Sequence, residues 1–183
     1  MKSGIGWSSR GRKGVDRNAI NENTGMILRV YRSNFYMEGF VAEPSPAELV
    51  ALAREFDLPV VVDLGSAAMV ATDLLAPLEH EPTTAGVLAD EVDLVCVSGD
   101  KLFGGPQAGI IAGKRELIAK LKKNPFFRAL RCDKMVLTAL QESVCAYLEA
   151  DQAAVSRQGS HRCPQTTVAL VHRSYWAGSS TTR

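Results

Sequence analysis

The stretch SGDKLFGGPQAG, residues 98–109, decides the fold prediction because it joins an apolar run to a glycine-rich turn. The run before it, residues 92–97, has the length and composition of a buried strand. Lys101 therefore stands where a core strand ends, and we expect partial desolvation there to favour a neutral, nucleophilic amine. Such an amine is suited to forming a Schiff base with an aldehyde. The glycines expected to allow close backbone approach or a positive φ angle are Gly104, Gly105 and Gly109.

A second predicted strand ends on a carboxylate, Asp63, within the sequence VVVDLGS at residues 60–66. Polar groups gather at the carboxyl ends of parallel strands because ligands bind in the crevice there. A lysine and a carboxylate in these two places are the pair that pyridoxal phosphate requires, since the amine binds the aldehyde and the carboxylate stabilises the protonated pyridine nitrogen. The alternative is a buried structural ion pair, or a turn lysine that reaches solvent.

The middle of the chain alternates between apolar runs of strand length and helical patterns. The predicted strands are 26–30, 60–64 and 92–97, and the predicted helices are 47–56 and a short one near 84–89. Nearly continuous apolar strands separated by helices indicate a parallel α/β sheet covered on both faces. Residues 108–112 form a further strand that is reached without a helix, so we expect it to run antiparallel to its predecessor.

Composition limits the classes of function. The chain has 183 residues, enough for one domain with its own core, and a net charge of +1 gives no overall reason to expect DNA as a partner. Residues 114–134 are locally basic, which is typical of a solvated helix face. The four cysteines lack CxxC spacing, so neither a metal site nor a disulfide framework is supported. With no apolar run of membrane-spanning length and no signal core, we expect a reduced cytoplasmic setting without a membrane partner.

Both ends differ in composition from the middle. Residues 1–15 are rich in glycine, serine and basic side chains, and residues 151–183 contain no acid beyond Asp151. We predict that both ends are disordered or aberrant tails, and that residues 16–150 form the folded domain.

Motifs spread from Arg17 to Leu148 carry a family resemblance. They are AINENT (19–24), RSNF (32–35), EGF (38–40), VDLGS (62–66), residues 98–109 and RALRCDK (128–134). In these motifs the chain resembles the bacterial selenocysteine synthases, L-seryl-tRNA(Sec) selenium transferases of the fold-type-I pyridoxal phosphate enzymes. The resemblance implies a truncated large domain, with a mostly parallel sheet and one antiparallel strand next to the lysine.

The resemblance also implies roles for individual residues of the cofactor site. Lys101 would form the Schiff base and move the proton at the substrate's α-carbon, and Asp63 would hold the pyridinium proton. Ser98 would bind the cofactor phosphate, although capping a turn is the alternative. Asp100 would orient or tune the lysine, although a Gly-Asp step is also ordinary turn chemistry.

Four further residues are assigned to substrate binding. Arg128 and Arg131 would share one face of a helical turn and grip an anion, selenophosphate in the resembling family. The alternative is surface charge beside two phenylalanines. Ser33 and Asn34, which follow the first strand, are the weaker candidates for substrate contact.

The function implied is conversion of seryl-tRNA(Sec) to selenocysteinyl-tRNA(Sec) with pyridoxal phosphate and selenophosphate, in a cytoplasmic, ring-like homo-oligomer. We expect this chain alone to be an inactive fragment, because the tRNA-binding and phosphate-cradling regions of the family lie upstream of Arg17. Two alternatives stay open. One is a related pyridoxal phosphate lyase for a small phosphorylated amino acid, and the other is a non-catalytic pseudogene product or assembly module.

Overall fold

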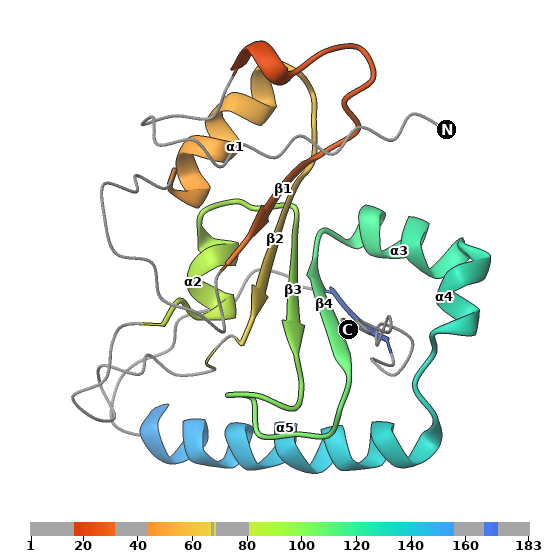
Figure 1. The fold of residues 1–183 in the computed structure, drawn as a ribbon. Helices are drawn as coiled ribbons and strands as arrows, with labels where there is room; N and C mark the ends of the chain where they lie inside the picture. Colours follow the sequence, from red (N-terminus) through yellow and green to blue (C-terminus); the bar gives the residue numbers. More distant parts are fainter. Residues whose placement is uncertain (1–16, 32–43, 67, 69–80, 156–166, 172–183) are drawn as a thin grey trace, which may run out of the picture. The chain divides into compact units, whose positions relative to one another are not determined.

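The structure, a computed structural model, describes residues 17–31, 44–66, 68, 81–155 and 167–171 (Figure 1). The chain divides into two compact units, Met1–Val97 and Ser98–Arg183.

The first unit contains parallel strands connected through helices. Its elements are the short 3-10 helix η1 (Arg17–Ala19), β1 (Ile27–Val30), α1 (Pro46–Glu55), β2 (Val60–Gly65), α2 (Thr84–Ala89) and β3 (Leu94–Ser98), whose last residue opens the second unit. β2 pairs in parallel with β1 on one side and with β3 on the other. The parallel arrangement and the order of strands and helices predicted for this region are confirmed, and the strand ends differ from the predicted ones by one or two residues.

Local signals in the sequence define both ends of α1. Ser45 caps the helix in a reciprocal capping box with Glu48, and Pro46 occupies the first turn, where it costs no hydrogen bond. The helix ends before Asp57, whose positive φ of 53° reverses the chain, and the Leu58 N–H donates to the Ala53 carbonyl at 3.0 Å. The predicted helix at 47–56 is therefore confirmed, with its last residue at Glu55.

Residues of β2 alternate between a buried and a half-buried face. Val60, Val62 and Leu64 are buried, and on β3 Val95 is fully buried. Asp63 lies on the other face of β2 and is half-buried. A period of two thus keeps the apolar side chains in the core and leaves the carboxylate accessible.

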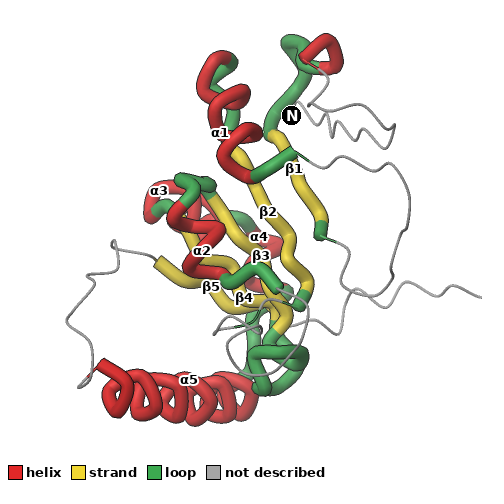
Figure 2. Tube along the Cα trace, turned by 90° about the vertical axis from the view of Figure 1, so that its left-hand side faces the viewer, coloured by secondary structure: helices red, strands yellow, loops and turns green. Residues whose placement is uncertain are grey.

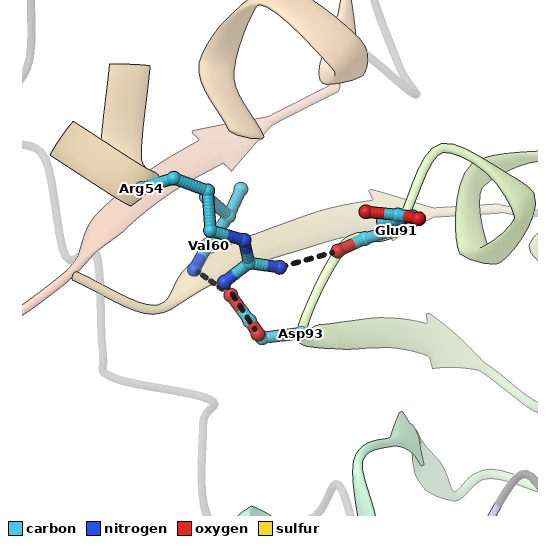
Figure 3. A network of polar contacts seen from close by, with 4 residues as sticks. All are labelled: Arg54, Val60, Glu91 and Asp93. Carbon is cyan, nitrogen blue, oxygen red and sulfur yellow. Dashed lines mark hydrogen bonds and ion pairs between the residues drawn. The ribbon is translucent and has the colours of Figure 1, made fainter. Parts of the chain in front are cut away.

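A buried carboxylate joins the starts of β2 and β3 (Figure 3). Asp93 is 3% exposed, and its Oδ2 accepts a hydrogen bond from the Val60 N–H at 2.7 Å. Arg54, from the end of α1, reaches Asp93 Oδ1 at 3.3 Å and donates to the Glu91 carbonyl at 3.1 Å. β3 was predicted to begin at residue 92, but it begins at Leu94, directly after Asp93.

The second unit combines helices with an antiparallel strand pair. Its elements are β4 (Gly109–Gly113), α3 (Arg115–Lys123), α4 (Pro125–Ala129), α5 (Lys134–Val155) and β5 (Thr167–Val171). β4 pairs antiparallel with β5, from Gly109 opposite Val171 to Gly113 opposite Thr167. The mixed α/β class, mostly parallel with one antiparallel pair, is thus as predicted, whereas the direction of residues 108–112 relative to the strand before them stays a prediction.

Two described segments fall inside the predicted C-terminal tail, residues 151–183. α5 continues to Val155, and β5 begins at Thr167. The predicted N-terminal tail, residues 1–15, lies outside the described residues. The division into a folded domain and two tails stays a prediction.

The core of the second unit forms around the turn that precedes β4. Phe103, Ala108, Cys132 and Leu140 are buried together, and Tyr147 packs against them. Figures 1 and 2 both show the loop that leads into β4 lying beside α5. Across the ranges that the structure describes, no helix combines the length and apolar character needed to cross a membrane.

Candidate functional site

Lys101 lies in a turn that follows β3 directly, and its side chain is half-buried. Three main-chain hydrogen bonds hold this turn. The Gly99 N–H donates to the Ala108 carbonyl at 2.8 Å, the Gly105 N–H donates to the Gly99 carbonyl at 2.7 Å, and the Gly104 N–H donates to the Lys101 carbonyl at 2.8 Å. The backbone that carries the lysine is therefore tied on both sides of it.

Glycines allow this turn to close. Gly104 has a φ of +72°, which other residues rarely adopt. A Cβ atom at Gly99 would lie 2.8 Å from the Pro106 carbonyl oxygen, and one at Gly105 would lie 3.2 Å from the Gly99 carbonyl oxygen. The expectations for Gly104 and Gly105 are met, whereas Gly109 has no positive φ and begins β4. The requirement at Gly99 was not predicted from the sequence.

Ser98 and Asp100 lie within three residues of the lysine. Ser98 is the last residue of β3, and both side chains are half-buried. Three predicted site residues, Ser98, Asp100 and Lys101, therefore stand on one short segment, as their positions in the sequence already require. Their individual roles stay predictions.

Asp63, the carboxylate predicted to bind the cofactor, lies in the first unit. Its Oδ1 accepts a hydrogen bond from the Gly65 N–H at 3.0 Å, and its carbonyl accepts one from the Tyr31 N–H at 2.7 Å. The pairing of β2 with β3 shifts between Asp63 and Gly65, and Gly65 has a φ of 63°. Irregularities of this kind often occur beside active sites, where they re-aim a side chain.

Cys96 stands opposite Asp63 in the register of β2 and β3. Burial and, to a lesser extent, the Asp63 carboxylate raise the pKa of the Cys96 thiol to about 11. Cys96 is therefore a neutral thiol at physiological pH and sits beside the carboxylate proposed to bind the cofactor. Sequence reasoning did not single out this residue, because only the strand register shows that the two are neighbours.

Arg128 and Arg131 belong to the second unit, and both side chains are exposed. α4 ends at Ala129, with Leu130 as its C-cap, so only Arg128 is helical. The expectation that both arginines lie in one helical turn is therefore wrong. Their assignment to anion binding stays a prediction.

The predicted site residues are divided between the two units and the residues that the structure does not describe. Ser33 and Asn34 lie outside the described residues. Asp63 belongs to the first unit, whereas Lys101 and the two arginines belong to the second. Within the described part of the chain, no three histidine, cysteine or acidic side chains are grouped so that they could hold a metal ion.

Comparison with known families identifies relatives of this chain. The family model described as "SelA: L-seryl-tRNA selenium transferase" matches residues 3–158. This range covers all the motifs that carried the resemblance, and it extends into both predicted tails.

Individual relatives agree with the family match. Proteins named L-seryl-tRNA(Sec) selenium transferase are 50% identical over 148 residues in Carboxydothermus hydrogenoformans and 47% identical over 149 residues in Mannheimia succiniciproducens. A protein of the same name from Escherichia coli is 47% identical over 147 residues. These alignments cover 80–81% of this chain and 31–32% of the relatives. The chain thus spans about a third of the length of the curated relatives it matches.

A solved structure supports the fold. The chain is similar to "Structure of D-Glucosaminate-6-phosphate Ammonia-lyase", with a TM-score of 0.57, 24% identity, and coverage of 79% of this chain and 35% of that one. At this level of identity the similarity concerns the fold alone. The resemblance inferred from the motifs is confirmed by the family match.

Proposed function

Because the chain belongs to the L-seryl-tRNA selenium transferase family, we propose that it is the central part of an enzyme that converts seryl-tRNA(Sec) into selenocysteinyl-tRNA(Sec). The cofactor is pyridoxal phosphate, and selenophosphate donates the selenium. The observation that carries the proposal is Lys101, held in a tied glycine turn directly after β3. The activity is assigned to this chain together with the remainder of a protein of the relatives' length.

The chemistry of the donor set fits pyridoxal phosphate. Lys101 supplies a primary amine for the aldehyde, Asp63 supplies a carboxylate for the pyridine nitrogen, and Ser98 supplies a hydroxyl for the phosphate. Ser98 ends β3, Lys101 follows it by three residues, and Asp63 lies two residues before the end of β2, so all three are near the carboxyl ends of strands, where α/β proteins bind their ligands.

The bound cofactor supplies an electron sink for negative charge at the substrate's α-carbon. Lys101, once its amine is free, takes the α-proton on Nζ, and a positioned group of this kind contributes about 10²- to 10⁴-fold in rate. Asp100, its neighbour in sequence, orients the lysine. Asp63, held by the Gly65 N–H, keeps a proton on the pyridine nitrogen.

Arg128 and Arg131 are assigned to the selenium donor. Both are exposed, so each guanidinium is reachable by a solute, and a guanidinium can bind a phosphate-like oxyanion through two parallel hydrogen bonds. Ser33 and Asn34 are assigned to contact with the seryl group. As the resemblance to this family implies, the proposed reaction takes place in the cytoplasm and in a homo-oligomer.

Covalent trapping tests the assignment of Lys101. The chain is incubated with pyridoxal phosphate, reduced with borohydride and digested, and the modified peptide is identified by mass spectrometry. We expect modification at Lys101 and its loss in Lys101→Arg. The exposed lysines Lys114 and Lys134 serve as internal controls, and preferential modification there would overturn the assignment.

The reaction itself is tested in a chimera. Residues 3–158 replace the matching segment of the Carboxydothermus hydrogenoformans relative, which supplies the flanking regions. We expect the chimera to form selenocysteinyl-tRNA from seryl-tRNA(Sec) and selenophosphate, and Lys101→Ala to abolish this activity. Turnover of small phosphorylated amino acids with no turnover of seryl-tRNA would instead favour the lyase alternative. A well-folded chimera that binds no cofactor would favour a non-catalytic role.

A further inference from the structure

The hydroxyl of Tyr147, on α5, reaches the turn that carries Lys101. Its oxygen lies 3.3 Å from the Leu102 carbonyl oxygen and 3.2 Å from the Phe103 carbonyl oxygen, so its single proton is shared between them. These carbonyls belong to the first and second residues after Lys101. A side chain far along the sequence therefore holds the backbone on the C-terminal side of the lysine.

Aromatic packing supports the same contact. The rings of Tyr147 and Phe103 are 5.6 Å apart between centroids and tilted by 38°, within the usual range for favourable ring pairs. Phe103 is 6% exposed, so this ring of the lysine turn is anchored in the core of the second unit.

Leu140 provides a second point of attachment on α5. It lies seven residues before Tyr147, which places both on one face of the helix. Its Cδ2 atom lies 3.4 Å from the position of a Cβ at Gly99 and 3.2 Å from that of a Cβ at Gly105. Leu140, 3% exposed, thus packs against the turn at the two glycines whose main chains hydrogen-bond to each other.

From these contacts we propose that α5 is a clamp on the lysine turn and that Tyr147 is a positioning residue for Lys101. The proposal rests on the role assigned to Lys101 in the proposed function. This role requires no contact of Tyr147 with the cofactor or the substrate. It acts by holding the two carbonyls after Lys101, so that the amine is presented from a fixed backbone.

The test compares two hydroxyl deletions on the same helix. Tyr147→Phe removes the hydroxyl that reaches the turn and keeps the ring. The matched control, Ser143→Ala, removes a hydroxyl that donates to the Ala139 carbonyl at 3.2 Å, within α5 itself. Both variants lose one hydrogen bond from a side chain to a carbonyl, but only Tyr147→Phe releases the turn.

Two measurements made without the cofactor test whether α5 holds the lysine turn. In hydrogen exchange, we expect amides at residues 99–108 to exchange about 2- to 12-fold faster in Tyr147→Phe, the range produced by losing one hydrogen bond of ordinary net strength. In competitive acetylation, we expect the half-buried Lys101 to become more reactive relative to the exposed Lys114. Ser143→Ala should leave both readouts unchanged.

A third measurement tests whether Tyr147 positions the Lys101 amine for reaction with the cofactor. At subsaturating pyridoxal phosphate, borohydride trapping at Lys101 should fall about 2- to 12-fold in Tyr147→Phe while its acetylation rises. A general loss of stability would not move the two reactions in opposite directions.

The outcomes separate this proposal from the proposed function. Unchanged exchange and acetylation in Tyr147→Phe, or equal effects in Ser143→Ala, would overturn the clamp. Faster exchange with unchanged trapping would overturn the positioning role. If wild-type Lys101 is never trapped, the positioning role and the assignment of Lys101 as the cofactor lysine both fail, whereas the exchange result still decides whether the clamp exists.

Discussion

Replacement of Asp93 tests what holds β2 and β3 in the register that places Asp63 beside Cys96. Asp93→Ala leaves the buried Val60 N–H without its 2.7 Å acceptor, which costs about 1–3 kcal/mol. It also removes the contact with Arg54, whose side chain is 43% exposed, so this contact contributes less than about 1 kcal/mol. We therefore expect Asp93→Ala to lower the free energy of unfolding by about 1–4 kcal/mol.

Asp93→Asn separates the two contributions. Its amide oxygen can still accept from the Val60 N–H, but the hydrogen bond loses its charge, so we expect a cost of about 1 kcal/mol. The assay is urea unfolding followed by far-UV circular dichroism, with the slope m compared between variants to confirm that the same surface is exposed. Equal destabilisation by the two variants would show that the ion pair with Arg54 dominates, and would refute the reasoning from the Val60 hydrogen bond.

The remaining predictions concern the site. The pKa of Cys96 is raised to about 11 from an ordinary value of 9.0, so protonation of this thiol stabilises the folded state. This contribution to the free energy of unfolding is complete below pH 9 and is lost between about pH 9 and 11. Unfolding measurements across that pH range would detect the loss. Asp63→Asn removes the carboxylate that helps to raise this pKa, so iodoacetamide should modify Cys96 faster at pH 8.5 in the variant, and an unchanged rate would mean that burial alone sets the pKa. Gly99→Ala should destabilise the chain by about 1–3 kcal/mol, because its Cβ meets the Pro106 carbonyl oxygen, whereas Gly104→Ala faces open space and should cost about 1 kcal/mol from its backbone angle alone. In the chimera, Arg131→Lys should weaken the use of selenophosphate about tenfold or more and leave trapping at Lys101 intact, since lysine keeps the charge but loses the planar fork; unchanged donor affinity with lower stability would assign Arg131 to packing.

The sequence by itself determined the local elements and the family. The helix at residues 47–56, the positions of β1 and β2 and the lysine turn were all predicted because each depends on neighbouring residues. Hydrophobic periodicity and capping act over a few residues, so they can be read without knowing the fold. The motifs around Asp63 and Lys101 are also short runs of neighbouring residues, so the family could be recognised from the sequence.

Only the tertiary structure decided which distant residues meet. Cys96 lies beside Asp63 because of the parallel register, Asp93 accepts a hydrogen bond from the Val60 N–H, and Tyr147 reaches the carbonyls after Lys101 from α5. Each of these contacts joins residues more than thirty positions apart, which no local pattern encodes. Their partners are selected by strand pairing and by packing against a shared core, and these form only when the chain has folded.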